Sequence, residues 1–211
     1  VLFIKAPNAD SGDKFGYRVS LSADGNTVAI SALGDSSASS AVSFREFSAN
    51  PIDDCNELNA VPTNCARESG AVFIFQRDRL GTGNLDWSRA ALTAYIKSPT
   101  AMPGDSFGSA ISLSGNGEVL AVGVINEDRG PKAQISFDSQ LFNLGYADCN
   151  LSDGSVNPAP FDYAINSGAA FLYQRAPRRD GNLDWSKGEL VAYLKPFNAS
   201  AGAEFGNAVS L

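Results

Sequence analysis

Short apolar runs separated by glycine-containing turns recur along this chain and predict β-strands. In the first run Val19 and Leu21 alternate with Ser20 and Ser22, a period of two that is typical of a strand with one buried face. The pair Asp24-Gly25 then supplies the positive φ that a tight hairpin requires. The next run is continuously apolar, which indicates a strand buried on both faces.

The same order of elements occurs twice. Candidate strands of the first unit lie at residues 19–22, 27–30, 71–75 and 92–97. In the second unit the hairpin turn lies at 115–118, and the apolar strand that follows it lies at 119–123. No segment has an apolar period of 3.6 residues over the length of a helix. We therefore predict an all-β chain.

Four sequence landmarks repeat in a fixed order, and repeats decide the architecture of such chains. They are the aromatic-aliphatic-Lys runs at 3–5, 95–97 and 193–195; Phe-Gly at 15, 107 and 205; Ser-Gly-Ala at 69–71 and 167–169; and Gly-Asn-Leu-Asp-Trp-Ser at 83–88 and 181–186. The units are therefore homologous.

A repeated unit of four antiparallel strands is typical of a blade of a β-propeller. The predicted parts are the last strand of a preceding blade (1–12), a blade with an insertion (13–97, insertion 33–68), a second such blade (105–195, insertion 125–166) and the first strand of a following blade (203–211). Two blades do not close a ring of about 4–8 blades. We expect a fragment of a longer propeller, or copies that associate to complete one.

The repeated motifs resemble FG-GAP repeats, a family that includes the β-propeller of integrin α subunits and many bacterial surface or secreted proteins. One departure is that the "GAP" element is Ser31-Ala32-Leu33 in one unit and Gly123-Val124-Ile125 in the other. The resemblance implies an extracellular binding or adhesion module, not an enzyme, that recognises a protein or glycan through long loops on one face. Long loops and repeat-specific insertions are often functional.

The resemblance also implies a possible cofactor, because integrin FG-GAP repeats often bind calcium in an Asp-rich loop between the first two strands. The aligned positions here are Ser20, Ser22, Asp24 and Val28, and Ser112, Ser114, Asn116 and Leu120. Calcium needs six to eight oxygen ligands, and most acidic ligands are missing. Asp24 is thus a calcium candidate, and a plain type I′ turn is the alternative.

Carboxylates also precede the Phe-Gly pairs. Asp10, Asp13 and Asp105 are candidates either for cation binding or for accepting backbone N–H bonds that fix the loop between units. The insertions carry further acids, for which we expect a solvated loop or a cation that pins it. These acids are Asp35, Asp53, Asp54, Glu57, Glu127, Asp128, Asp148, Asp153 and Asp162.

The three cysteines indicate an oxidising compartment. Cys55 and Cys65 lie in one polar loop, where we expect a disulfide, and Cys149 is either free or bonded outside the chain. Asn150 and Asn198 begin glycosylation sequons. Each of these features suits a secreted or cell-surface protein.

Aromatic residues divide into recurring and unique ones. Trp87 and Trp185 recur at one place in each unit, which favours a core or interblade anchor. The insertion aromatics do not recur and are candidates for a binding surface or for the small core of their own loop. They are Phe142, Tyr146, Phe161 and Tyr163.

Composition narrows the function classes. A net charge of −7 argues against nucleic acid as a partner, since that binding depends on Lys and Arg. The chain has no histidine, which excludes Ser–His–Asp catalysis and His-ligated zinc within it. The longest apolar run, 119–125, falls short of the ~20 residues of a spanning helix, so we expect no membrane insertion in this segment. Two alternatives to recognition stay open: a structural subunit of a fibre or shell assembled through edge strands, and a glycan-processing enzyme that uses loop carboxylates.

Overall fold

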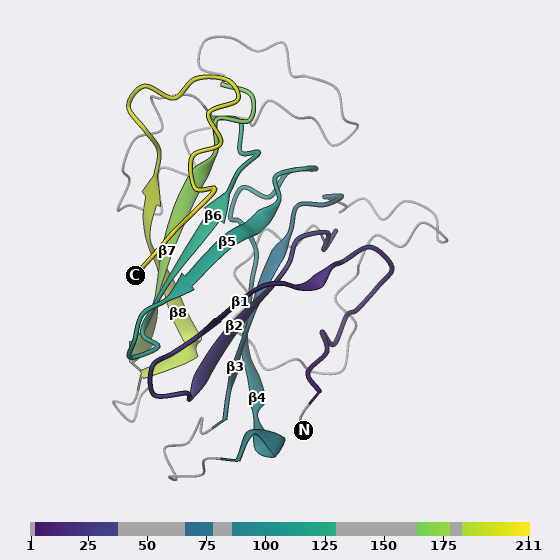
Figure 1. Cartoon of the computed structure of the whole chain (residues 1–211), viewed down its shortest axis with the longest axis vertical. Helices are drawn as coiled ribbons and strands as arrows, with labels where there is room; N and C mark the ends of the chain where they lie inside the picture. The colour runs from purple at the N-terminus through teal and green to yellow at the C-terminus, as the bar shows by residue number, and fades with distance from the viewer. Residues whose placement is uncertain (1–2, 38–65, 78–85, 130–163, 178–182) are drawn as a thin grey trace.

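The computed structural model describes residues 3–37, 66–77, 86–129, 164–177 and 183–211 (Figure 1). They form two four-stranded antiparallel sheets with strand orders β1-β2-β3-β4 and β5-β6-β7-β8. The strands of the first sheet are β1 (Phe15–Leu21), β2 (Thr27–Ala32), β3 (Ala71–Gln76) and β4 (Ala91–Ile96). Those of the second are β5 (Phe107–Leu113), β6 (Val119–Val124), β7 (Ala169–Pro177) and β8 (Leu183–Leu194), and a 3₁₀ helix η1 (Trp87–Arg89) precedes β4. The prediction of an all-β chain with four antiparallel strands in each repeat is confirmed.

Local sequence explains the strands. Every residue of β2 and β3 is buried, as the continuously apolar runs predict for central strands. The loop between β1 and β2 differs from the expected type I′ turn, which needs two positive φ angles. Gly25 (φ 66) has the positive φ in this loop, and its N–H donates to the Ser22 carbonyl at 2.9 Å. The connection between β1 and β2 therefore spans the five residues 22–26, and the Ser22 N–H donates to the Thr27 carbonyl at 2.9 Å.

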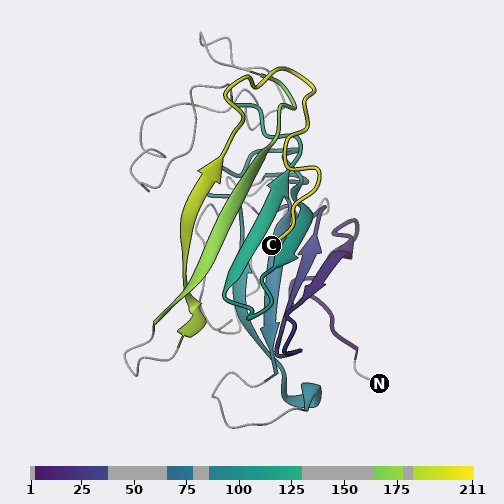
Figure 2. The same ribbon diagram turned by 60° about the vertical axis from the view of Figure 1, so that its left-hand side comes forward.

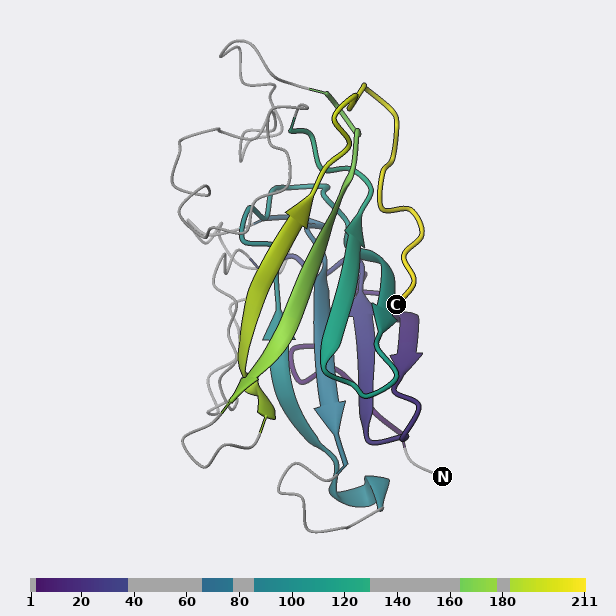
Figure 3. The same cartoon turned by 90° about the vertical axis from the view of Figure 1, so that its left-hand side faces the viewer.

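The two sheets stack face to face (Figures 2 and 3). The main apolar core lies between them, with Val72, Ile74 and Ile96 of the first sheet against Phe107 and Phe171 of the second. A second core, which contains Phe73, lies on the other face of the first sheet. Phe73 and Phe171 occupy equivalent positions of the repeat, so the sheets pack head to tail and present different faces to each other.

The Phe-Gly start of β5 forms the contact between the units. The Phe107 N–H donates to the Ser69 carbonyl at 2.8 Å, and the Leu113 N–H donates to Ser20 Oγ at 2.9 Å. A side chain at Gly108 would place its Cβ 2.8 Å from the Cβ of Ser31. Glycine here lets the second unit approach the first closely.

The C-terminal segment repeats this contact on the second sheet. The Phe205 N–H donates to the Ser167 carbonyl at 2.8 Å, and the Leu211 N–H donates to Ser112 Oγ at 3.0 Å. A Cβ at Gly206 would lie 2.2 Å from the Ala169 carbonyl oxygen. Residues 203–211 therefore dock as β5 does, although they form an isolated bridge rather than a strand, and the described part of 1–12 contains turns and no strand.

Candidate functional site

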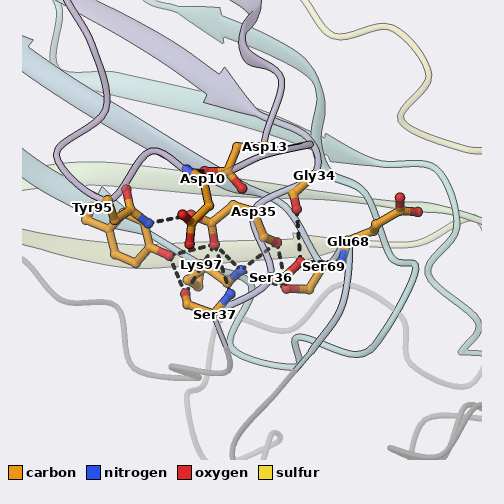
Figure 4. A network of polar contacts seen from close by, with 11 residues as sticks. Asp10, Asp13, Gly34, Asp35, Ser36, Ser37, Glu68, Ser69, Tyr95 and Lys97 are labelled. Atoms are coloured by element: carbon orange, nitrogen blue, oxygen red, sulfur yellow. Dashed lines mark hydrogen bonds and ion pairs between the residues drawn. The ribbon is translucent and has the colours of Figure 1, made fainter. Parts of the chain in front are cut away.

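A buried ion pair lies where the first sheet meets the insertion that follows β2 (Figure 4). Lys97 Nζ is 2.8 Å from Asp35 Oδ1, and both side chains are 0% exposed. The ammonium also donates to Ser69 Oγ at 2.7 Å and to the Asp35 carbonyl at 3.3 Å. The lysine thus joins the residue after β4 to the ends of β2 and β3.

The Asp35 carboxylate has further donors around it. The Tyr95 hydroxyl donates to it at 2.8 Å, Ser37 Oγ at 3.1 Å and Asn8 Nδ2 at 2.9 Å. Burial alone would raise the pKa of this carboxyl, but the Lys97 ammonium and the hydrogen bonds outweigh burial and hold its pKa below the usual value. Asp35 is therefore ionised at neutral pH, and its charge is compensated inside the fold.

The second unit repeats the arrangement with a longer acid. Lys195 Nζ contacts Glu127 Oε2, and both side chains are 0% exposed. The Tyr193 hydroxyl donates to Glu127 Oε1 at 2.9 Å, and Ser167 Oγ donates to the Glu127 carbonyl at 3.3 Å. A Tyr-x-Lys run at the end of the fourth strand and an acid after the second strand therefore form one cluster per unit.

Each cluster lies beneath the two ends of a long segment whose interior falls outside the described residues. The Ala66 N–H donates to the Ser36 carbonyl at 3.2 Å, which joins the ends of 38–65. The Ala164 N–H donates to the Asp128 carbonyl at 3.0 Å, which joins the ends of 130–163. The chain therefore leaves and re-enters each sheet at one point.

Both points lie at the same end of the two sheets. At the opposite end the first hairpins touch, since the Ala23 N–H donates to the Gly115 carbonyl at 2.8 Å. We call the points where 38–65 and 130–163 leave and re-enter the sheets the roots of the insertions. Between the two roots, Asn126 Nδ2 donates to the Gly104 carbonyl at 2.9 Å, and the Gly104 N–H donates to the Arg67 carbonyl at 2.7 Å. The loop before β5 thus connects the roots of the two insertions.

The expectation of solvated insertion acids is wrong for Asp35, Glu127 and Asp128, which are 0% exposed. The sequence contained a signal for this, because Lys97 and Lys195 recur at the end of apolar strands and a buried lysine requires a partner. The other insertion acids fall outside the described residues: Asp53, Asp54, Glu57, Asp148, Asp153 and Asp162.

The carboxylates before the Phe-Gly pairs accept main-chain bonds. Asp13 Oδ2 accepts from the Asp10 N–H at 2.7 Å, and Asp105 Oδ2 accepts from the Met102 N–H at 2.8 Å. These are the contacts that the structural alternative for Asp13 and Asp105 predicts. Burial, opposed mainly by the Asp10 N–H, raises the pKa of Asp13.

Asp24 holds the first hairpin together. Its Oδ1 accepts from Ser22 Oγ at 2.6 Å and from the Asn26 N–H at 2.9 Å, and its Oδ2 accepts from Asn26 Nδ2 at 2.9 Å. In the part of the chain that the structure describes, no group of three or more Asp, Glu, Cys or His residues lies together in a way that could hold a metal ion.

Most other candidate residues fall outside the described ranges. These are Cys55, Cys65, Cys149, Asn150, Phe142, Tyr146, Phe161 and Tyr163. Asn198 is described and lies exposed in a turn after β8, where a glycan would be accessible.

The two tryptophans differ despite their identical flanking residues. Trp185 lies in β8, is 0% exposed within the core between the sheets, and donates from Nε1 to the Gly117 carbonyl at 3.0 Å. Trp87 begins η1 and packs half-buried against the second core. Trp185 therefore has the anchoring position expected for both, and Trp87 has a more peripheral one.

Comparison with protein-family models, curated proteins and solved structures gave no match to this chain. Among the described residues, no helix has the length and apolar character needed to cross a membrane.

Proposed function

We propose that this chain is a binding module of an FG-GAP-type β-propeller protein, secreted or at the cell surface, which recognises a protein or glycan without chemical turnover. One observation carries the proposal: the long segments 38–65 and 130–163 start and finish at the same end of the two sheets, each above a buried lysine–carboxylate cluster. Two insertions on one face of a repeat architecture are typical of a binding face.

The buried clusters support a positioning role. A buried ion pair adds little net stability, because desolvation offsets the attraction between the charges. Its repetition at Lys97 and Lys195 is therefore better explained by geometry. Lys97 joins Asp35, after β2, to Ser69, before β3. Lys195 holds Glu127, after β6, and the Glu127 carbonyl also accepts from Ser167, before β7. Loops held on a rigid scaffold are the usual place for recognition.

The packing of the units supports the propeller part of the proposal. The second sheet docks on the first through Phe107, and the segment from Phe205 docks on the second sheet through an equivalent main-chain bond. A head-to-tail relation that recurs from unit to unit is the relation between blades of a propeller, and further units would complete the ring.

The test is binding to an array of immobilised glycans and to a displayed peptide library. One variant replaces 38–65 with a short Gly-Ser linker and a second replaces 130–163. The matched control replaces 78–85, the segment between β3 and β4. This segment starts at the opposite end of the first sheet, where the Arg77 N–H donates to the Asn26 carbonyl. We expect binding by the full chain and the control, and loss of binding in a loop variant that still folds. Equal binding by all variants would contradict the proposal, and release of sugar from the array would favour glycan cleavage instead.

A further inference from the structure

The strand β1 exposes a row of apolar side chains. Tyr17, Val19 and Leu21 are 41%, 60% and 56% exposed. The equivalent residues of the second unit are Ser109, Ile111 and Leu113, which are buried or half-buried where β5 packs on the first sheet. The first unit therefore presents to solvent the surface that the second unit uses to dock.

The backbone of β1 already has the docking conformation. Gly16 has φ +92°, close to the values of Gly108 (+91°) and Gly206 (+86°). At Gly108 and Gly206 the preceding unit comes within 3 Å of a would-be Cβ, whereas at Gly16 nothing lies within 4 Å. This positive φ is a conformation that side chains other than glycine rarely adopt, so β1 is shaped for a close neighbour.

The complementary surface is the outer face of the second sheet. That face receives the segment from Phe205 to Leu211 through the Ser167 carbonyl and Ser112 Oγ. The first sheet receives β5 through the equivalent Ser69 carbonyl and Ser20 Oγ. One recognition geometry therefore occurs twice in the chain, each time for a strand that begins with Phe-Gly.

We propose that β1 of one copy docks on the outer face of the second sheet of another copy and displaces residues 203–211 of that copy. The new interface continues the one that joins the two units within the chain. Such head-to-tail contacts are heterologous and produce rings or filaments. β1 would bring the exposed side chains of Tyr17, Val19 and Leu21 to this interface, where their burial is favourable.

Sedimentation velocity over a wide range of protein concentration tests this proposal. Val19→Lys with Leu21→Lys places charges on the docking row at exposed positions and leaves folding intact. Phe197→Lys is the matched control, because Phe197 is an apolar side chain that is 78% exposed and lies outside the row. Gly206→Val clashes with the Ala169 carbonyl and frees the acceptor face.

We expect the full chain and Phe197→Lys to associate at the same protein concentration. The double variant should need at least about tenfold more protein to associate, the equivalent of about 1.4 kcal/mol. Gly206→Val should associate at a lower concentration than the full chain. Replacing the loops 38–65 and 130–163 should leave association unchanged, which separates this proposal from loop-mediated binding. If the full chain and Gly206→Val both stay monomeric, or the double variant associates like the full chain, self-docking is overturned. The first of these results would leave β1 as a surface for a different partner.

Discussion

Replacing Lys97 with Met removes the cation from the buried cluster of the first unit and keeps most of the side-chain volume. Asp35 would then lie buried beside Tyr95 and Ser37 without its counter-charge. Breaking one partner of a buried pair costs about 3–5 kcal/mol. Because a domain of this kind is stable by about 5–15 kcal/mol, the variant should lose a large fraction of its free energy of unfolding.

The loss should depend on pH in a direction that identifies the pair. The pKa of Asp35 is lowered in the folded protein, so its stabilising contribution is present above the unfolded value of about 3.9 and disappears as pH falls through the folded value. In Lys97→Met the buried carboxyl has a raised pKa, so the penalty is present at neutral pH and disappears as pH falls below about 3.9. The difference in free energy of unfolding between the natural chain and Lys97→Met should therefore become smaller at acid pH.

Urea denaturation at neutral and acid pH measures both effects. Lys5→Met is the matched control, since Lys5 ends the first copy of the same aromatic-aliphatic-Lys motif and is exposed. Its substitution should change the free energy of unfolding by less than about 0.5 kcal/mol. If Lys97→Met costs no more than Lys5→Met at neutral pH, the buried pair does not hold the root of the insertion, and our reasoning fails.

Three further predictions concern single side chains. Asp13→Asn keeps an acceptor for the Asp10 N–H but removes a carboxyl whose pKa is raised by burial. The variant should be more stable than the natural chain at pH 7 and equally stable near pH 3. A stability difference that does not change with pH would refute this prediction. Tyr173→Phe removes a buried hydroxyl that has no hydrogen-bond partner among the described residues, so chemical denaturation should show a gain of about 1 kcal/mol, whereas a loss would reveal a bond to that hydroxyl. Asp24→Ala removes the three hydrogen bonds of the first hairpin and should lower the melting temperature equally in calcium and in chelator; a larger drop in calcium would indicate a cation at Asp24.

The strands were predictable because their signals are local. The alternation of Val19 and Leu21, the glycines of the hairpins and the apolar runs of β2 and β6 depend on neighbouring residues alone. The repeats then fixed the grouping into two sheets. The head-to-tail packing of these sheets could not be predicted from the sequence, because Phe73 and Phe171 occupy equivalent positions of the repeat but face different cores.

The clusters beneath the insertions were missed because an acid in a polar stretch resembles a solvated one. Asp35 is followed by serines, and its partner Lys97 lies directly after β4, far from Asp35 in the sequence. A contact between residues distant in the sequence therefore decides the burial of both. The hexapeptide at 83–88 and 181–186 shows the same dependence on context. Trp185 fits between two sheets and extends β8, whereas Trp87, on the other face of the first sheet, forms η1 capped by Asp86.

A designed disulfide tests the central claim, that the two units pack head to tail with their first hairpins together and their insertions at the other end. A Cβ at Gly115 would lie 3.6 Å from the Cβ of Ala23, within the range of about 3.5–4.5 Å between the Cβ atoms of a disulfide. In the variant Ala23→Cys with Gly115→Cys, peptide mapping after mild oxidation should find these two residues cross-linked within one chain. Recovery of both as free thiols, in a protein that is folded, would contradict the arrangement.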